Sequence, residues 1–197
     1  MDSTAPDGIT PAAILDFWFA RGDGATLQPR KEWWEKNPAF DREIERRFGA
    51  AVEQALAGAF EDWTATAEGA LALIILLDQF TRNIYRGQAK CYAGDERARG
   101  ITHAAIGRGF DIAVPPVMRQ FFYMPLQHSE TVEEQNLSVL LFTALEKELP
   151  GHDLLHWAER HRDVVIEFGR FPHRNVILGR ESTPPEIEFL RQPGSSF

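Results

Sequence analysis

The chain has 197 residues, of which 44% are hydrophobic, 11% aromatic and 25% charged, a composition typical of a folded globular protein rather than a disordered one. Its formal net charge of −8 argues against a non-specific nucleic-acid binder, which needs a basic face. The single cysteine excludes an internal disulfide framework. The lack of a basic leader, or of an apolar run longer than Ala70 to Leu77, predicts a cytoplasmic protein that does not bind membranes.

Helix-initiating residues recur along the first half of the chain. Thr10-Pro11 predicts a short helix that Gly22-Asp23-Gly24 ends, because a hydroxyl caps a helix and proline fits its first turn. Asn37-Pro38 predicts a second helix by the same signal. Thr66 predicts a third, whose centre at 71–77 (LALIILL) is apolar on every side and therefore belongs in the core. A buried strand is the competing interpretation of this short apolar run.

The second half of the chain continues the pattern. Further helices are predicted to start at Asp95, to cover Val117 to Tyr123 between Pro115-Pro116 and Pro125, and to cover Asp153 to Phe168. Thr131-x-x-Glu134 and Thr183-Pro-Pro-Glu186 have the spacing of capping boxes. The helix after Thr131 is expected to be strongly amphipathic, with an apolar set of Leu137, Leu140, Leu141, Ala144 and Leu145.

These signals predict an all-α protein. No segment shows the sustained alternation of a β-strand, and no linker is long enough to divide the chain. We therefore expect a single domain over residues 1–197, with about seven to nine helices packed as antiparallel pairs. The consensus residues of a tetratricopeptide repeat do not appear. The sequence does not indicate an oligomeric state, although Trp33 and Trp34 are candidates for exposed interface residues.

Three segments place polar residues where they are not expected, and the first is 76–87 (LLDQFTRNIYRG). At about 100° per residue, Asp78 follows the buried face of the apolar helix, and Arg82 and Arg86 lie four and eight residues further on roughly the same side. Asn83 lies on a neighbouring face. Because buried ions must be paired, the arrangement indicates either an anion site at the end of a core helix or a structural Asp–Arg network.

The second segment is Tyr123 to Glu130 (YMPLQHSE), in the turn before a predicted helix. His128 is a candidate general base, since imidazole titrates near neutral pH, and Glu130 is a candidate for fixing its tautomer. A histidine beside a helix start also has a structural interpretation, in which it bonds to backbone carbonyls.

The third segment, Phe168 to Thr183, reads as an ordered loop because glycine and proline punctuate it. Its polar residues are Arg170, His173, Arg174, Asn175 and Arg180. A local cluster of positive charge in an acidic protein predicts an anion-binding patch. The alternative is that these residues cap helices and pair with Asp78, Glu130 or Glu134.

No metal or cofactor site is predicted. His152 and His156 lie four residues apart, but the zinc-protease glutamate between them is missing. Cys91 follows Lys90 without a Cys-His motif, so an inert thiol is expected. Glycine-rich phosphate loops and a Gly-x-Ser-x-Gly elbow are absent from the sequence.

The motifs DFWF, WWEKNPAFD, LLDQFTRNIYRG, YMPLQHSE and FGRFPHRNVILGRESTPPE together resemble those of a widespread, uncharacterised bacterial family in the tetratricopeptide-like superfamily. The resemblance extends from about Ile14 to Leu190. It implies a tetratricopeptide-like stack of antiparallel helix pairs. It implies no established activity, and no catalytic role is carried over from it.

These residues suggest two functions of different classes, and a third interpretation that is purely structural. As a binding module, the protein would hold a small anion, a carboxylate or an acidic peptide through Arg82, Asn83, Arg86, Arg170, Arg174 and Asn175, with aromatic contacts from Trp33, Trp34 and Phe121. As an enzyme on a small anionic metabolite, it would use His128 or His173 as acid or base, oriented by Asp78 or Glu130. In the third interpretation, all three segments form one structural polar network.

Overall fold

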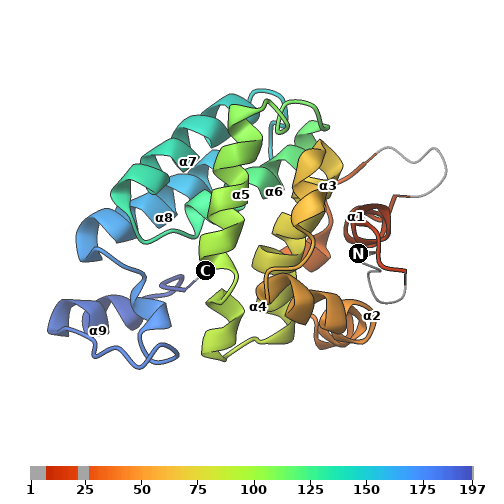
Figure 1. Cartoon of the computed structure of the whole chain (residues 1–197). Coiled ribbons are helices and arrows are strands. Elements are labelled where there is room, and N and C mark those ends of the chain that lie inside the picture. Colours follow the sequence, from red (N-terminus) through yellow and green to blue (C-terminus); the bar gives the residue numbers. More distant parts are fainter. Residues whose placement is uncertain (1–7, 22–26, 197) are drawn as a thin grey trace. The chain divides into compact units, whose positions relative to one another are not determined.

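The computed structural model describes residues 8–21 and 27–196, and the regular secondary structure within them is helical (Figure 1). The α-helices are α1 (Pro11–Phe19), α2 (Pro38–Leu56), α3 (Ala67–Ile74), α4 (Thr81–Ile84), α5 (Asp95–Gly107), α6 (Pro116–Gln127), α7 (Val132–Leu145), α8 (Leu154–Phe168) and α9 (Pro184–Leu190). Short 3₁₀ turns occupy Lys31–Trp33, Glu61–Ala65, Ala89–Tyr92 and Pro172–Arg174. The all-α prediction is confirmed. The predicted stop at Gly22-Asp23-Gly24 lies outside the described residues.

The chain divides into two compact units. Unit 1 comprises Met1–Arg86 and Lys90–Pro125, and unit 2 comprises Gly87–Ala89 and Leu126–Phe197. The expectation of one domain over 1–197 stays a prediction, as does the tetratricopeptide-like stacking. None of the helices described here has the length and apolar character needed to cross a bilayer.

The buried centre of unit 1 is α3. Thr66 caps it as predicted, since its hydroxyl oxygen accepts a 3.1 Å hydrogen bond from the Gly69 amide. Every residue from Gly69 to Ile74 is buried, so the apolar run is a core helix and not a strand. Helices α1 and α5 pack against it, and α1 lies close to α3 in Figure 1.

Beyond α3 the helix continues as a π-helix over Ile75–Phe80 and then returns to α-helical geometry as α4. The sequence was interpreted as a continuous α-helix here, so this widening is a correction. Within it, the Thr81 hydroxyl donates to the Leu77 carbonyl at 2.8 Å. The backbone of Gly94 lies so close that a Cβ there would be 2.2 Å from the Leu77 oxygen.

Aromatic rings fill much of the remaining core of unit 1. Trp33 is buried, its indole N–H donates to the Trp18 carbonyl at 3.0 Å, and its ring meets the edge of Phe121 at 4.9 Å. The expectation that Trp33 is exposed is therefore wrong. Trp34 is 53% exposed and fits that expectation.

Helix α6 does not end before Pro125, as the sequence predicted, but at Gln127. Proline inside a helix removes one backbone hydrogen bond, and its ring crowds the carbonyl four residues earlier. Phe122 and Leu126 are both fully buried, and this burial on either side of Pro125 offsets that loss.

In unit 2, α7 and α8 lie side by side as a hairpin (Figure 1). Thr131 is the N-cap of α7, but its side chain makes no capping hydrogen bond, so the first predicted capping box is wrong. The buried residues of α7 are Gln135, Ser138, Phe142 and Leu145, whereas Leu140 is 66% exposed. The predicted apolar face is therefore largely wrong, because two polar residues point inward.

The segment after α8 ends in α9, whose capping box is confirmed. The Thr183 amide donates to the Glu186 carboxylate at 2.7 Å, and the Glu186 amide donates to the Thr183 hydroxyl at 3.5 Å. A small apolar cluster of Val164, Val165 and Phe171 supports this end of unit 2, and Phe168 and Phe189 pack on it.

Candidate functional site

Asp78 is fully buried within the π-helix of unit 1 and is held by its neighbours. Its Oδ1 lies 3.1 Å from an Arg82 nitrogen, and its Oδ2 accepts a 2.6 Å hydrogen bond from the Gln79 amide. Arg82 also donates to both oxygens of Asp95, at 2.9 and 3.1 Å. Burial alone would lower the pKa of Arg82, but Asp78 and Asp95 raise it, so the guanidinium stays charged.

Two other polar residues of the first segment, Asn83 and Arg86, contact a different carboxylate, that of Asp41. Asn83 donates to Asp41 at 2.7 Å, and Arg86 donates to the same carboxylate at 3.1 Å. Because α4 ends at Ile84, Arg86 does not continue the face that carries Asp78, which corrects the sequence interpretation. In unit 1 these residues form ion pairs and hydrogen bonds that tie helices together.

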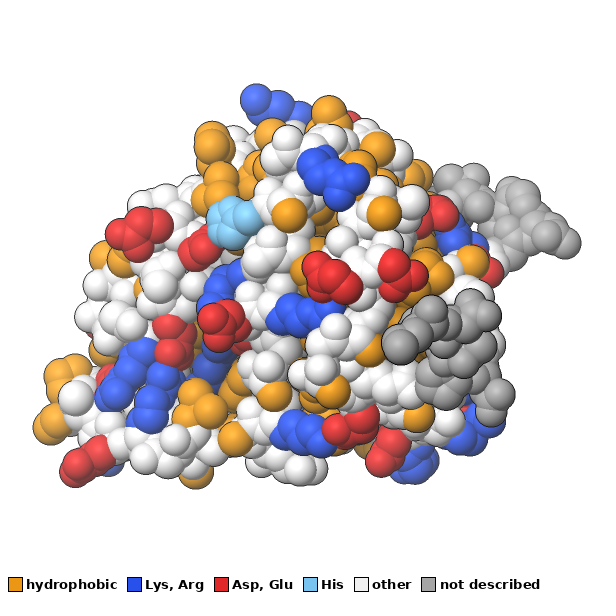
Figure 2. Space-filling view, in the orientation of Figure 1, with side chains coloured by type: hydrophobic (Ala, Val, Ile, Leu, Met, Phe, Trp, Pro, Cys, Tyr) orange, Lys and Arg blue, Asp and Glu red, His pale blue; other side chains and the backbone are white. Residues whose placement is uncertain are grey.

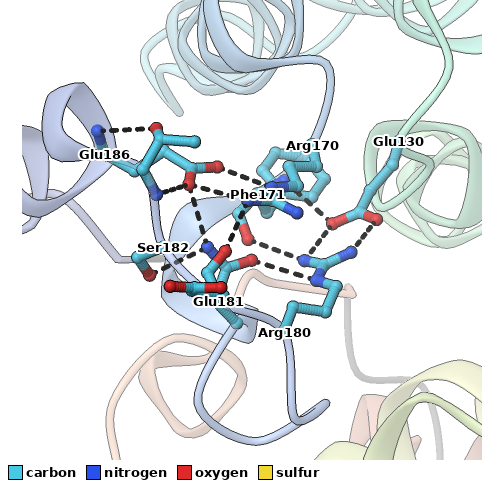
Figure 3. A network of polar contacts seen from close by, with 9 residues as sticks. Glu130, Arg170, Phe171, Arg180, Glu181, Ser182 and Glu186 are labelled. Carbon is cyan, nitrogen blue, oxygen red and sulfur yellow. Dashed lines mark hydrogen bonds and ion pairs between the residues drawn. The ribbon is translucent and has the colours of Figure 1, made fainter.

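In unit 2, Glu130 joins the second and third segments (Figure 3). Its oxygens accept hydrogen bonds from Arg180 at 2.6 and 2.9 Å and from the Phe171 amide at 2.8 Å. Burial would raise the pKa of Glu130, but the Arg180 and Phe171 hydrogen bonds lower it. The predicted alternative, a pairing of the third segment with Glu130, is thus confirmed for Arg180.

A second carboxylate, Glu186, organises the rest of this loop (Figure 3). Arg170 donates to its two oxygens at 2.6 and 2.8 Å, and Asn175 donates to Oε2 at 3.3 Å and to Ser182 at 3.0 Å. The Arg170 hydrogen bond is the main cause that lowers the pKa of Glu186 to about 2. Arg170 and Asn175 are therefore engaged in holding the loop against α9.

Arg174 belongs to the same loop and is buried. It donates to the His128 carbonyl at 2.9 Å, and its guanidinium carbon lies 4.6 Å from the centre of the Phe171 ring. These two contacts orient the guanidinium, and its charge helps to lower the pKa of Glu130. They also bring His128 and Arg174, from segments far apart in sequence, into one place.

Three histidines lie near this guanidinium, which bonds to the His128 carbonyl and whose charge helps to lower the pKa of His161 and His173. The His128 and His161 rings are 6.3 Å apart, His161 lies 5.6 Å from Phe171, and His173 lies 5.6 Å from the same ring. We call His128, His161, His173 and Arg174 the His–Arg cluster. His128 and His173 are half-buried, whereas His161 is only 6% exposed.

Two of the imidazoles are neutral at pH 7. Burial lowers the pKa of His161 to about 3, with a further contribution from His128. Burial, and then the charge of Arg174, lower the pKa of His173 to about 4. The Nδ1–H of His161 donates to the Trp157 carbonyl at 2.7 Å, and Gln127 Nε2 lies 3.1 Å from the same nitrogen.

The inward polar face of α7 adjoins this cluster. The Gln135 amide nitrogen donates to the carbonyls of Gln127 and Ser129, both at 2.7 Å, on either side of His128. The sequence interpretation missed Ser138 and gave His161 no role in a site. The available signal was the polar pair Gln135 and Ser138 at i, i+3 within an otherwise leucine-rich helix.

The structure thus brings His128, Glu130, Arg170, His173, Arg174 and Asn175 into unit 2, and holds Asp78, Arg82, Asn83 and Arg86 in unit 1. Convergence of the second and third segments is confirmed by the Glu130 and Arg174 contacts. That the first segment joins them stays a prediction, and so do the catalytic and binding roles.

A groove of about 550 Å³ lies along α5 in unit 1, and its lining includes none of these residues. Its lining includes small residues such as Ala93, Gly100 and Ala104. Its arginines, Arg97 and Arg108, donate to backbone carbonyls at the ends of neighbouring helical segments. Among residues 8–21 and 27–196, no group of three or more His, Cys, Asp or Glu side chains is arranged to hold a metal ion.

Comparison with known proteins gives the class of the chain. The model of a family of bacterial proteins of unknown function, DUF924, matches residues 14–194, so the chain belongs to this family. A solved structure of a protein of unknown function from Agrobacterium tumefaciens is 43% identical, with a TM-score of 0.82 over 92% of this chain and 96% of that one. No curated protein matches the chain.

Proposed function

We propose that unit 2 binds a small anion, a carboxylate or a phosphate, at the His–Arg cluster. One observation carries the proposal, namely that Arg174 is fixed by the His128 carbonyl and the Phe171 ring while three imidazoles gather around it. Guanidinium and imidazole N–H groups are the donors that carboxylates and phosphates prefer. His128 and His173 are half-buried, so each keeps part of its surface exposed to solvent.

The other arginines that the sequence suggested for anion binding are less suitable than Arg174, because of the contacts they make. Arg82, Arg86 and Arg170 each form close ion pairs with Asp or Glu, so an anion would have to displace a carboxylate there. Glu130, whose pKa the charge of Arg174 helps to lower, also forms two hydrogen bonds with Arg180. What distinguishes Arg174 is its place beside His161 and His173, whose N–H groups would bind an anion together with it.

The enzyme alternative, in which His173 acts as general base, has weaker support. A base is most effective when its pKa lies near the working pH, and the pKa of His173 is about 4. At neutral pH such an imidazole holds a proton poorly, although it still donates a hydrogen bond from its one N–H. Binding is therefore the better-supported function.

The test is calorimetric titration of the full chain with sodium phosphate and with sodium acetate in a low-chloride buffer at pH 6.5. We expect saturable binding, weakened ~10-fold or more in Arg174→Gln, because a charge-assisted hydrogen bond is lost. Arg191→Gln is the matched control, since Arg191 is exposed and pairs only with its helix neighbour Glu188 among the contacts seen. It should bind as the wild type does.

Folding is checked by thermal melting, because Arg174 is buried and its substitution removes contacts inside unit 2. His173→Gln provides a second variant at a half-buried position and should weaken binding by a few-fold, ~3 or more. Absence of binding by the wild type, or equal affinity in the wild type and in both cluster variants, would show that the cluster is structural.

A further inference from the structure

Helix α7 directs two hydrogen-bonding atoms into the interior of unit 2 that find no partner there. Gln135 and Ser138 are both 0% exposed. Within the described residues, Gln135 Oε1 and Ser138 Oγ have no hydrogen-bond partner. At i, i+3 on one helix, the two side chains share a face. A buried polar atom left in this state is destabilising, so a purely structural helix gains nothing from the pair.

The orientation of the Gln135 amide is fixed by its other end. Its nitrogen donates to the Gln127 and Ser129 carbonyls, and only the NH₂ group is able to donate to both. The oxygen must therefore point away from these carbonyls, as a free acceptor. The carbonyl between them, that of His128, accepts from Arg174. The free acceptor and the guanidinium thus flank the same three-residue turn.

The inference below rests on the proposed function and names the class of its ligand. We propose that the anion at the His–Arg cluster carries a hydrogen-bond donor of its own, as a hydroxy- or amino-carboxylate does, and that Gln135 Oε1 and Ser138 Oγ receive this donor. The carboxylate of such a ligand lies on Arg174, and its hydroxyl or ammonium group completes the bonds that α7 leaves open. A phosphate or a plain carboxylate makes only the first set of contacts.

The discriminating experiment compares propionate with lactate and 3-hydroxypropionate by calorimetric titration of the full chain. The three acids have the same number of carbon atoms and differ in whether, and at which carbon, a hydroxyl is present. A site built for a hydroxyl rejects the analogue without one, because its own polar groups then remain unpaired. We expect at least one hydroxy acid to bind ~10-fold or more tightly than propionate.

Ser138→Ala gives a readout that a structural role would not produce. The change removes a buried hydroxyl without a partner, so the melting temperature should rise, while the preference for the hydroxy acid over propionate should fall by ~3-fold or more. Thr143→Ala is the matched control on α7, because its hydroxyl is exposed and bonds to the Val139 carbonyl. It should leave the preference unchanged.

The outcomes separate the two proposals. If propionate and both hydroxy acids bind equally, the proposal of a donor-bearing ligand is wrong and the anion site stands. If none of the acids nor phosphate binds, both proposals fail. A Ser138→Ala protein that melts lower and keeps the full preference would remove Ser138 from the site.

Discussion

Arginine supplies nearly all of the positive charge of this protein, since lysine occurs only at Lys31, Lys36, Lys90 and Lys147. The ion pairs show what arginine provides that lysine does not, since one guanidinium binds several acceptors at once. One guanidinium, that of Arg180, donates to both oxygens of Glu130, to the Asn175 side chain and to the Phe171 carbonyl. A lysine ammonium has neither the planar fork nor the reach for such a set.

The Asp78 cluster allows a direct test of its structural role. Asp78→Ala should lower the free energy of unfolding by about 2–3 kcal/mol, because Arg82 and Gln79 lose a buried charged partner. The loss stays below that of an isolated buried charge, since Asp95 still pairs with Arg82. Urea unfolding measures it. The control Asp16→Ala breaks an exposed pair with Arg21 and should cost less than about 1 kcal/mol, and similar small losses in both would place Asp78 outside the network.

His161 predicts how stability depends on pH. Its pKa is about 3 in the folded protein and 6.5 ordinarily, so below pH 6.5 the unfolded chain takes up a proton that the folded chain does not. Stability from this group is therefore complete above pH 6.5 and declines as the pH falls, by about 2–3 kcal/mol at pH 4.5. His173 acts in the same direction.

The measurement is urea unfolding of wild type and His161→Leu at several pH values from 7.5 to 4.5. The variant should show a shallower decline, because the titrating group is gone. His156→Leu, at an exposed position of the same helix, should keep the wild-type slope. Parallel curves for wild type and His161→Leu would contradict a buried, neutral imidazole.

At the scale of elements, α5 begins against the π-helix with almost no space between the backbones. The φ of Gly94 is −90°, which any residue adopts, so its glycine is required by contact with Leu77 and not by conformation. This is a case in which one element fixes the sequence of another. Neither the widened turn nor the contact is visible in the local pattern of either segment.

Two glycines of this region form a matched pair. Gly94→Ala should lower the free energy of unfolding by more than about 2 kcal/mol, because the new methyl group meets a carbonyl oxygen and backbone must move. Gly100→Ala, in the middle of α5 with nothing within 4 Å, should raise it by about 0.5–1 kcal/mol. Urea unfolding of both variants checks the pair, and equal effects would mean that Gly94 is not in close contact.

At the scale of the whole molecule, the net charge is acidic, but many positive and negative side chains are paired locally. Each unit contains its own ion pairs, such as Arg86 with Asp41 in unit 1 and Arg170 with Glu186 in unit 2. On the face shown in Figure 2, Lys and Arg side chains are mixed with Asp and Glu rather than gathered into one field. Such a surface fits a small, enclosed anion site better than an extended polyanion.

What the sequence predicts well depends on short range. The caps at Asn37, Thr66 and Thr183 are confirmed because a cap and its partner lie within four residues. The Asp78–Arg82 pair, one helical turn apart, also follows from spacing. Local sequence signals therefore predicted the all-α class and most of the helix starts.

What the sequence misses depends on distant partners. The inward face of α7 is set by the carbonyls of Gln127 and Ser129, so leucine periodicity gives the wrong face. Arg174 meets the His128 carbonyl across 46 residues, and no local spacing encodes that contact. The candidate site in unit 2 therefore appears only when the second and third segments are placed in space.

The π-helix at Ile75–Phe80 decides how a change in the number of residues would act in this stretch. Its i to i+5 bonding holds one residue more per turn than an α-helix. Deleting a single residue here would let the helix run on in α form and keep the direction of the side chains that follow, because the wide turn accommodates the extra residue. Arg82 would then still face Asp95, so a relative shorter by one position should have kept that ion pair.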